Sequence, residues 1–334
     1  MRLSVIVSVY NDNHDNFLQQ CMDSILDQDL SEDDYEVIAV DDLSTDDSLE
    51  VLREYEKKDK RVKVIAREEN GGPGAGKNTG IRAAQGTYVA YIDHDDFIAK
   101  DAYKRLLELA EKEDADLCGG GWQVMNNVTK VIKPMENKVF NKTGEITDEM
   151  REMIYVRGER FWNKIIRKSI ITDSDIYLSE GTYIDDTPTT PVWMCLCEKY
   201  AHLDEIVYTT RVHTDSSSRS GLTYEKAHQH MITQHRMVEN AKKAGIYDKF
   251  KTAIQFRYFY RGYIQSSYLC RKTMKPMEVM KYYVALRHDL LVHVPGFRAN
   301  KYIRQRCTKK QLINARAFMD TPMLYDLMMK LLDD

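Results

Sequence analysis

The chain has 334 residues, 43% hydrophobic and 30% charged, with a formal net charge of −4, which suits a globular protein with one large domain and a second part. No apolar run approaches the roughly 20 residues that a membrane-spanning helix requires. The N-terminal run "LSVIVSV" is β-branched and lacks the small-residue cleavage site of a signal peptide. We therefore expect a cytoplasmic protein rather than an integral membrane or secreted one.

Five apolar runs alternate with helical patterns over the first 125 residues. The runs 3–9, 35–42, 62–66, 88–93 and 116–125 are short and rich in β-branched residues, which predicts buried strands. The stretches 15–28, 46–58, 75–85 and 101–113 predict helices between them. Strands that are apolar on both faces and alternate with helices predict an α/β domain with a mainly parallel, doubly wound sheet.

Polar side chains follow the strands of this predicted sheet, at the edge where a doubly wound sheet binds its ligands. Tyr10 and Asn11 follow the first run, Asp42 ends the second, and Asp93–Asp96 end the fourth. A glycine-rich segment, 70–78, follows the third run. The sequence therefore predicts a polar site at this edge.

The chain changes character at about residue 220. Residues 126–220 give a mixed pattern, in which 180–201 is typical of a loop that leads into a helix. From 221 to 334 the pattern is helical, with many Tyr and Met. We expect a catalytic α/β domain at 1–220 and a helical region at 221–334.

The helical region is basic, because residues 241–316 hold eighteen Lys and Arg against three Asp and Glu. Such a window attracts anions. The aromatic and arginine residues of 255–272 suit peripheral contact with the inner membrane surface. Binding to an anionic polymer is a second interpretation. A third is a helical bundle with a Tyr and Met core and a basic surface, in which the apolar stripe near the end of the chain (321–334) packs on the domain or, in a homo-oligomer, on a neighbouring subunit. No nucleic-acid-binding motif is recognised, so we expect no nucleic-acid partner.

The six cysteines do not form a recognisable metal motif. Cys195 and Cys197 are one residue apart, which is not the usual spacing of zinc ligands. We expect reduced cysteines in the core.

The segment "GGPGAGKN" (71–78) approaches the pattern of a phosphate-binding P-loop. A P-loop places Ser or Thr directly after its lysine to hold the metal, whereas Lys77 is followed by Asn78. Pro73 also removes a backbone donor from the phosphate cradle. A P-loop-like nucleoside triphosphatase or kinase therefore remains the alternative function.

Five segments carry a more specific pattern: "SVIVSVYN" (4–11), "VIAVDDLSTDDS" (37–48), "ENGGPGAGKNTGIRAAQGTYVAYIDHDD" (69–96), "FWNKIIRKSI" (161–170) and "EGTYIDD" (180–186). In this order they resemble glycosyltransferase family 2, the inverting nucleotide-sugar enzymes, of the type that builds bacterial surface polysaccharides or teichoic acids. The resemblance is unbroken over the first 100 residues and looser to about 220. It implies a GT-A fold, which is a Rossmann-like sheet, here followed by a mostly helical region.

The acidic cluster after the fourth run fits a metal site. Asp93 and Asp95 are two residues apart, so in an extended segment both carboxylates point to one side, and Mg²⁺ and Mn²⁺ prefer carboxylate oxygens. The resemblance implies that Asp95 is the principal ligand of Mn²⁺ or Mg²⁺ and that Asp93 faces the ribose or the metal. It also implies that His94 and Asp96 lie near the donor and that His213 is a third metal ligand. The alternative is a group of turn and cap residues before the next helix.

The resemblance also implies how the donor is held. The family's aspartate at the position of Asp42 accepts a hydrogen bond from the uracil N3–H, and Tyr10 and Asn11 would line the base pocket. Glycines of the 70–78 segment would let the backbone approach the nucleotide. Lys77 would pair with the diphosphate as a point charge, and Asn78 matches the family's Arg-Asn-x-Gly segment beside it.

An inverting transfer requires a general base that takes the proton of the acceptor hydroxyl. By resemblance the base is Asp186, supported by Asp185, at the opening of a helix. The other interpretation is that Asp186 only caps that helix, since Asp before Thr-Pro is a good N-cap.

Two further segments fall near the active site by resemblance. Trp162, Asn163 and Lys164 match a family segment and are expected to help form the acceptor pocket. Arg211 and Ser216 are expected in a loop that closes over the diphosphate.

These observations predict a metal-dependent inverting hexosyltransferase. Its donor would be a UDP-sugar, and its acceptor a hydroxyl of a glycan or lipid-linked precursor of a bacterial surface polysaccharide. We place it in the cytoplasm, with peripheral contact at the cytoplasmic face of the plasma membrane as an open interpretation. Besides the triphosphatase, a non-catalytic nucleotide-sugar-binding protein is the remaining alternative.

Overall fold

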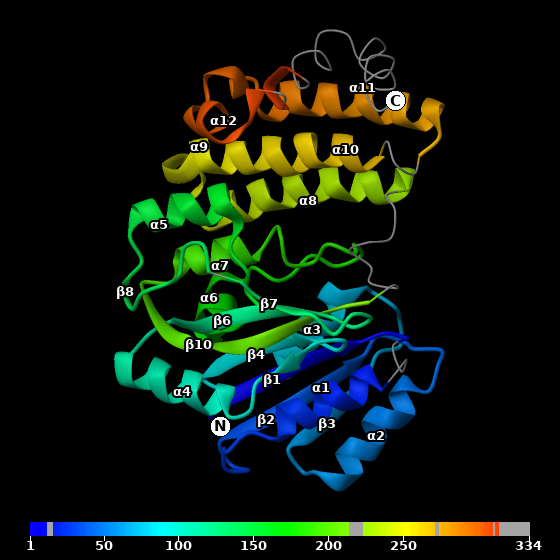
Figure 1. Ribbon diagram of the computed structural model, residues 1–334, viewed down its shortest axis with the longest axis vertical. Helices are drawn as coiled ribbons and strands as arrows, with labels where there is room; N and C mark the ends of the chain where they lie inside the picture. Colours follow the sequence, from blue (N-terminus) through cyan, green and yellow to red (C-terminus); the bar gives the residue numbers. More distant parts are fainter. Residues whose placement is uncertain (12–15, 136, 214–222, 271–273, 310, 314–334) are drawn as a thin grey trace. The chain divides into compact units, whose positions relative to one another are not determined.

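The structure is a computed structural model that describes all residues except 12–15, 136, 214–222, 271–273, 310 and 314–334. The chain divides into two compact units, Met1–Ser216 and Ser217–Asp334 (Figure 1). The apolar stripe expected at 321–334 and the expected loop residue Ser216 lie outside the described residues.

Unit 1 is built on a mixed sheet, which has ten strands among the described residues. Their order is β3-β2-β1-β4-β9-β6-β10-β5, with β7 beside β6 and β8 beside β10. The strands are β1 (Leu3–Val9), β2 (Tyr35–Asp41), β3 (Val62–Ala66), β4 (Tyr88–Asp93), β5 (Phe97–Ile98), β6 (Leu117–Asn126), β7 (Ile132–Met135), β8 (Gly144–Glu145), β9 (Lys164–Arg167) and β10 (Lys199–Val212). The predicted strands are thus all present.

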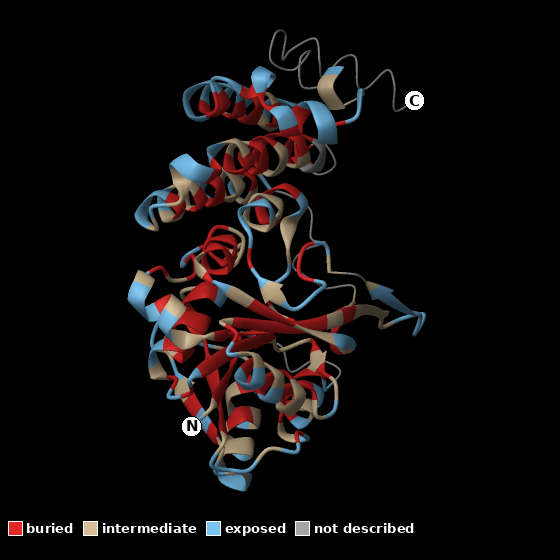
Figure 2. Ribbon diagram, turned by 90° about the vertical axis from the view of Figure 1, so that its left-hand side faces the viewer, coloured by how far each residue is buried: buried red, intermediate tan, exposed pale blue. Residues whose placement is uncertain are grey.

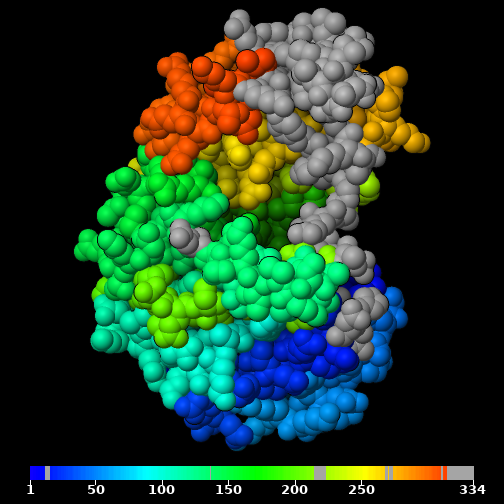
Figure 3. All heavy atoms as spheres, in the orientation of Figure 1, coloured from blue at the N-terminus to red at the C-terminus, as the bar shows by residue number. Residues whose placement is uncertain are grey.

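The sheet has a parallel half and a mixed half. The strands β3, β2, β1 and β4 run parallel, as predicted. The short strand β9 pairs antiparallel with both β4 and β6, so it separates β6 from the parallel set. The long strand β10 then runs parallel to β6, while β7 lies largely exposed at the surface of unit 1 (blue-green in Figure 3). The sequence predicted β6 but not the antiparallel strand β9 that lies between β4 and β6 in the sheet.

The helices of unit 1 occupy the positions that the sequence predicts for its first half. They are α1 (Phe17–Leu26), α2 (Ser48–Lys58), α3 (Pro73–Ala83), α4 (Ala102–Glu113), α5 (Asp148–Met153), the π-helical turn η1 (Ile154–Gly158), α6 (Lys168–Ser174) and α7 (Thr190–Leu196). Helix α3 begins at Pro73 and not at residue 75 as expected, because proline at the first helical position loses no hydrogen bond. The predicted loop in 180–201 does lead into a helix, α7.

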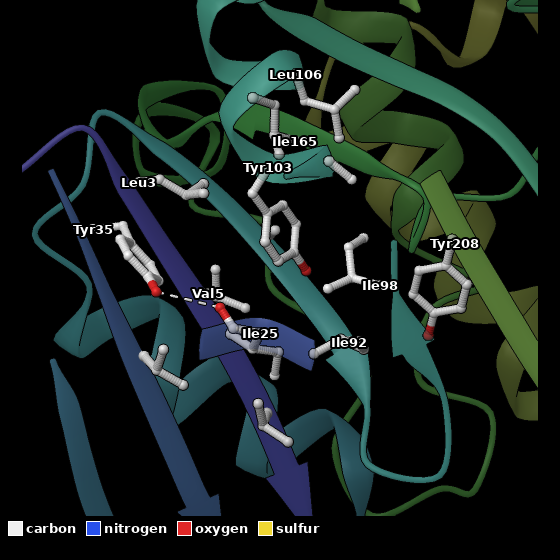
Figure 4. Close-up of a cluster of buried hydrophobic side chains, with 14 of the residues drawn as sticks. Leu3, Val5, Ile25, Tyr35, Ile92, Ile98, Tyr103, Leu106, Ile165 and Tyr208 are labelled. Atoms are coloured by element: carbon white, nitrogen blue, oxygen red, sulfur yellow. Dashed lines mark hydrogen bonds between the residues drawn. The ribbon is translucent and has the colours of Figure 1, made fainter. Parts of the chain in front are cut away.

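The central strand β1 is buried on both faces, which explains its continuous apolar run. Its residues Leu3 and Val5 belong to a core cluster with side chains of α1, α2 and α4 (Figure 4). Its alternate residues Ile6 and Ser8 face α3, because a Cβ on Gly80 or Gly76 would overlap them. Figure 2 shows this burial of the central strands. The sheet is therefore covered by helices on both faces.

The described residues of unit 2 form helices joined by short turns and contain no strand. It contains α8 (Tyr224–Lys243), α9 (Tyr247–Arg257), the π-helical segment η2 (Tyr258–Gln265), α10 (Ser266–Cys270), α11 (Pro276–His293), the 3₁₀ turn η3 (Phe297–Ala299) and α12 (Lys301–Arg306). Among the described residues, no helix combines the length and the hydropathy needed to cross a bilayer. All six cysteines of the chain are buried free thiols.

Candidate active site

The end of β4 meets the end of β10 at a carboxylate–imidazole pair. Nε2 of His213 lies 3.1 Å from Oδ2 of Asp95, although the two residues are 118 positions apart in the chain. Both side chains are part-buried. The fold thus brings together two of the three residues expected to hold a divalent cation; their role as ligands stays a prediction.

Asp96 is bonded to β10, and its place near the donor stays a prediction. Its side chain is buried, and both oxygens accept hydrogen bonds from β10. Tyr208 donates its hydroxyl to Oδ2 at 2.8 Å, and the backbone N–H of Arg211 donates to Oδ1 at 2.6 Å. Burial, together with Asp95 and Asp93 nearby, raises the pKa of Asp96 well above its usual range. Asp96 therefore fastens residues 93–96, the acidic turn, to β10.

The sequence led us to expect Arg211 in a loop, but it lies in β10. Its side chain is buried. Nε donates to the carbonyl oxygen of Asp95 at 2.9 Å, and a terminal nitrogen donates to Gln20 Oε1 at 2.9 Å. The guanidinium also lies 4.2 Å from the ring centroid of Phe17. Arg211 thus holds the backbone of the acidic turn in place.

His94 is tied to the central strand and not directed freely toward a donor. Its Nδ1 lies 2.8 Å from the carbonyl oxygen of Ser8 in β1. Since Asp93 and Asp95 flank His94 in the chain, this contact fixes the position of the backbone that carries their side chains.

Lys77 connects the acidic turn to the segment that precedes α7. Its buried ammonium lies 2.8 Å from Asp93 Oδ1 and 3.0 Å from Asp185 Oδ2, and 4.6 Å from the ring centroid of Tyr91. Asp186, the next residue along, is close enough to act on the charge of Lys77. We expected Lys77 to face the diphosphate; in this structure it lies between carboxylates.

The charges in this cluster shift one another's pKa values. Burial lowers the pKa of Lys77, but Asp185 and Asp93 raise it further, so the net shift is upward and the ammonium stays charged. Burial raises the pKa of Asp185, and Lys77 offsets this only in part. For Asp93, Lys77 outweighs burial and the pKa is lowered. Asp185 is the carboxylate whose charge costs more, because it is more deeply buried and lies beside Asp186.

The glycines of α3 lie close to other protein atoms. A Cβ on Gly74 would overlap the carbonyl oxygen of Ser179, and one on Gly76 would overlap the hydroxyl of Ser8. Gly74 thus admits the backbone of Ser179, and Gly76 admits the side chain of Ser8. A close approach of the 70–78 backbone to the nucleotide stays a prediction.

Asn78 also binds protein atoms. Its fully buried amide donates to the carbonyl oxygen of Leu178 at 3.0 Å and to Glu180 at 2.7 Å, and its oxygen accepts from the Leu178 N–H at 2.9 Å. It therefore holds α3 to the segment that carries Asp185, and its role beside the donor stays a prediction.

Asp42, at the end of β2, organises the loop after β3. Its buried carboxylate accepts from Nε of Arg67 at 2.7 Å and from the backbone N–H groups of Gly71 and Gly72, the latter at 2.7 Å. Arg67 also donates to Thr79 Oγ1 at 2.7 Å. We did not single out Arg67, although it directly follows β3 and the strand-end rule applies to it. That Asp42 accepts a hydrogen bond from uracil N3–H stays a prediction.

The residues after β1 differ in their freedom. Tyr10 is 47% exposed, which leaves its ring open for stacking. Asn11 has a left-handed backbone (φ 50°), and its side-chain oxygen accepts from the N–H of Thr45 at 2.6 Å. Its own N–H donates to Ser44 Oγ at 3.1 Å. Asn11 thus joins β1 to the loop after β2.

Asp186 lies in a turn ahead of α7, not at its N-cap. The N-cap is Thr189, and the carbonyl oxygen of Asp186 accepts from the N–H groups of Thr189 and Thr190. Thr187 donates its hydroxyl to Asp186 Oδ1 at 3.1 Å. The interpretation that Asp186 caps the helix is therefore wrong, while its role as the base stays a prediction.

Asn163 and Lys164 are buried and bond to protein atoms, while their part in an acceptor pocket stays a prediction. Lys164 is buried and bonds to Glu159 at 3.1 Å and to Asn163 at 2.8 Å. Asn163 is buried and donates to the carbonyl oxygen of Gly120 at 2.6 Å. Trp162 is part-buried and packs 4.4 Å from the Tyr208 ring, centroid to centroid. Of the three, only Trp162 is partly exposed to solvent.

Comparison with known proteins gives one family. The sequence profile described as "Glycosyl transferase family 2" matches residues 4–173. Glycosyltransferase EpsJ of Bacillus subtilis, described as uncharacterized, is 29% identical over 256 residues, which cover 75% of this chain and 71% of that protein. The poly(ribitol-phosphate) beta-glucosyltransferase of Bacillus spizizenii is 32% identical over 178 residues, or 53% of this chain and only 26% of that protein.

Solved structures share the fold. S. aureus TarS 1–349, crystallised in complex with UDP-GlcNAc, superposes with a TM-score of 0.69 at 22% identity, over 96% of this chain and 91% of that chain. A Pyrobaculum calidifontis mannosyltransferase, in complex with GDP-Man and Mn²⁺, gives a TM-score of 0.52 at 14% identity, over 96% and 88% of the two chains. This likeness confirms the predicted GT-A fold with its helical C-terminal region.

Proposed function

The chain belongs to glycosyl transferase family 2, and from this premise we propose that it transfers a sugar from a UDP-sugar to a hydroxyl of a bacterial surface-polysaccharide precursor. The observation that carries the proposal is the Lys77 bridge. Through it, Asp93 of the acidic turn is joined to Asp185, the neighbour of Asp186. A carboxylate edge for the donor and a second carboxylate for the acceptor thus belong to one cluster.

Two features support a UDP-sugar as the donor. The TarS structure that shares the fold was determined with UDP-GlcNAc. In this chain, the exposed ring of Tyr10 and the buried carboxylate of Asp42 follow neighbouring strands of the parallel sheet. An exposed aromatic ring suits stacking on a base, and a carboxylate oxygen suits a hydrogen bond from uracil N3–H.

The residues at the β4 edge fit a divalent cation. Asp95 and His213 already place a carboxylate oxygen and an imidazole nitrogen 3.1 Å apart, and Asp93 adds a second carboxylate whose side chain is 41% exposed. Carboxylate ligands favour Mn²⁺ or Mg²⁺, and imidazole tolerates Mn²⁺ better than Mg²⁺. When bound, the cation supplies Lewis-acid stabilisation of the diphosphate leaving group.

The protein's own groups then provide the remaining chemistry. The acceptor oxygen forms a bond to the anomeric carbon while the bond from that carbon to the diphosphate breaks and UDP leaves with the electron pair. Asp186 takes the proton of the acceptor hydroxyl as general base. Asp185, fixed by Lys77, holds the segment in position. Attack on the face opposite to the leaving group inverts the anomeric configuration.

The relatives narrow the acceptor class. A Bacillus spizizenii relative is a poly(ribitol-phosphate) beta-glucosyltransferase, so we propose a polyol-phosphate or lipid-linked glycan as the acceptor. The excess of Lys and Arg in 241–316 would attract such an anion. The same charge would favour the cytoplasmic face of the plasma membrane.

A donor screen tests the proposal. UDP release is measured for a panel of UDP-sugars with Mn²⁺ or Mg²⁺, with and without poly(ribitol phosphate), and compared with an EDTA control. We expect metal-dependent UDP release that the acceptor stimulates and that Asp186→Asn abolishes. Hydrolysis of ATP without release of UDP would favour the triphosphatase, and UDP-sugar binding without turnover would favour a non-catalytic protein.

A further inference from the structure

Two helices of unit 2 bring three metal-binding side chains together. One ligand atom from each of His235 on α8 and Asp289 and His293 on α11 lies within 4.8 Å of the other two. His235 Nε2 is 2.6 Å from Asp289 Oδ1, and His293 Nε2 is 3.7 Å from the same oxygen. The two imidazole rings lie 4.5 Å apart, centroid to centroid.

The arrangement follows from helix geometry. Asp289 and His293 are four residues apart on α11, so they share one face, and α8 packs on α11, with Tyr282 donating its hydroxyl to the carbonyl oxygen of Ala227 at 3.0 Å. His235 reaches the pair from that neighbouring helix.

Tyr258 fixes the orientation of the carboxylate. Its hydroxyl donates to Asp289 Oδ2 at 2.6 Å, so the other oxygen, Oδ1, is turned to the imidazoles. Asp289 itself is buried. In metal sites, a carboxylate that binds the metal through one oxygen is commonly hydrogen-bonded through its other oxygen to a neighbouring residue.

We propose that His235, Asp289 and His293 bind one transition-metal dication of the Zn²⁺ class, which fastens α8 to α11. Two imidazoles and one carboxylate form a donor set that zinc accepts, whereas Mn²⁺ binds nitrogen ligands more weakly in the divalent series. The site uses none of the residues assigned to glycosyl transfer and goes beyond that function.

The geometry needs only a small adjustment. A tetrahedral zinc with ligands at about 2.0–2.1 Å separates its ligand atoms by about 3.3 Å. The two separations from Asp289 Oδ1, 2.6 and 3.7 Å, lie on either side of this value, and the ligand nitrogens of the two imidazoles lie within 4.8 Å of each other. The side chains of His235 and His293 are 35% and 41% exposed, so a water molecule can reach a fourth position. The nearby Glu239 and Lys242 are exposed and opposite in charge, so their effects on a cation largely cancel.

The test uses the full chain with Asp95→Asn, so that the proposed donor-metal site is disabled. Co²⁺ is titrated into the chelator-treated protein and followed by its visible absorption, and Zn²⁺ is titrated in competition with a chromophoric chelator. Thermal unfolding is recorded with and without Zn²⁺. The test variants are His293→Ala, at an exposed position, and Tyr258→Phe. The matched control is His288→Ala, an exposed histidine one residue before Asp289 on the same helix.

We expect one equivalent of Co²⁺ with the spectrum of a nitrogen- and oxygen-ligated, four-coordinate ion, and a Zn²⁺-dependent rise in Tm. His293→Ala should weaken Zn²⁺ binding by at least about 100-fold, and Tyr258→Phe by about 10- to 100-fold, while His288→Ala should change neither result. Equal Zn²⁺ affinity in the His293→Ala and His288→Ala proteins, or no saturable Co²⁺ spectrum, would overturn the proposal. Because Asp95→Asn is present throughout, the outcome is independent of whether the chain transfers sugar.

Discussion

The ammonium of Lys77 lies 3.0 Å from the carboxylate of Asp185, and both side chains are buried. The two residues come from helix α3 and from the turn before α7, so the contact joins segments that are remote in sequence. A buried charge that loses its partner is strongly destabilising. Lys77 is therefore a structural centre of the site as well as a part of its electrostatics.

Lys77→Met should lower the free energy of unfolding by about 3 kcal/mol at pH 7, because it leaves two carboxylates without their cation. With Lys77 absent, the pKa values of Asp93 and Asp185 rise, so both groups take up protons as the pH falls toward about 4. In the wild type, the pKa of Asp93 is lowered. Its contribution to the free energy of unfolding is therefore lost only as the pH falls through that lowered pKa. The gap between variant and wild type should therefore narrow on acidification, as measured by urea unfolding at a series of pH values.

The matched control is Arg82→Met, on the same helix. Arg82 is 54% exposed and 3.7 Å from Glu180, so its loss should cost less than about 1 kcal/mol. If the free energy of unfolding of Lys77→Met equals that of the wild type, or is lower by the same amount at every pH, the bridge does not stabilise the fold.

Asp186→Asn should separate binding from transfer. Asp186 is half-buried and does not cap α7, so we expect an unchanged Tm and an unchanged Kd for UDP. Loss of the general base should reduce kcat by about 10²- to 10⁴-fold. Steady-state UDP release and calorimetric UDP binding measure the two effects. Asp173→Asn, at an exposed position on α6, serves as the control, and near-normal turnover in Asp186→Asn would assign the base elsewhere.

The sequence predicted the parallel half of the site well, because the rule for strand ends depends on local pattern alone. Asp42 and Asp95 lie at the predicted edge for that reason. The hydrogen-bond partners of Asp96 could not be predicted from local pattern, because Tyr208 and Arg211 lie 112 and 115 residues further along the chain. Their strand, β10, has register irregularities between Leu203 and Tyr208, so it lacks the strict alternation that identifies a strand.

The partners of the polar residues in α3 could not be predicted from the sequence, for a related reason. Lys77 and Asn78 follow a glycine-rich stretch, which suggested an open loop facing the nucleotide. The structure places both in a buried helix instead, where their partners are Asp185 and Leu178. Which side of a short helix is covered depends on a segment 100 residues away, and no local pattern reports that.

Removal of the divalent cation should stop transfer, and Mn²⁺ should restore it. Asp95→Ala should abolish Mn²⁺-dependent UDP binding, because the principal carboxylate is lost. His213→Ala should weaken it at least about tenfold, or about 1.4 kcal/mol, as measured by calorimetry with and without Mn²⁺. His202→Ala, toward the other end of β10, should leave Mn²⁺-dependent binding intact. If His213→Ala behaves like His202→Ala, the imidazole near Asp95 is not a ligand.

Gly74→Ala should distort the site by packing alone. The added Cβ would overlap the carbonyl oxygen of Ser179 and come within 3.1 Å of Asp185 Cβ, so the segment before α7 must move. Overpacking of this kind costs about 1–3 kcal/mol, although alanine itself favours a helix by about 1 kcal/mol. We expect a lower Tm and a lower kcat, with a smaller change in the Kd for UDP. Gly296→Ala, where nothing lies within 4 Å of the new Cβ, should be neutral. A nucleotide-cradling glycine would give the opposite pattern, in which UDP binding is lost while Tm stays the same, and calorimetry of the two variants distinguishes them.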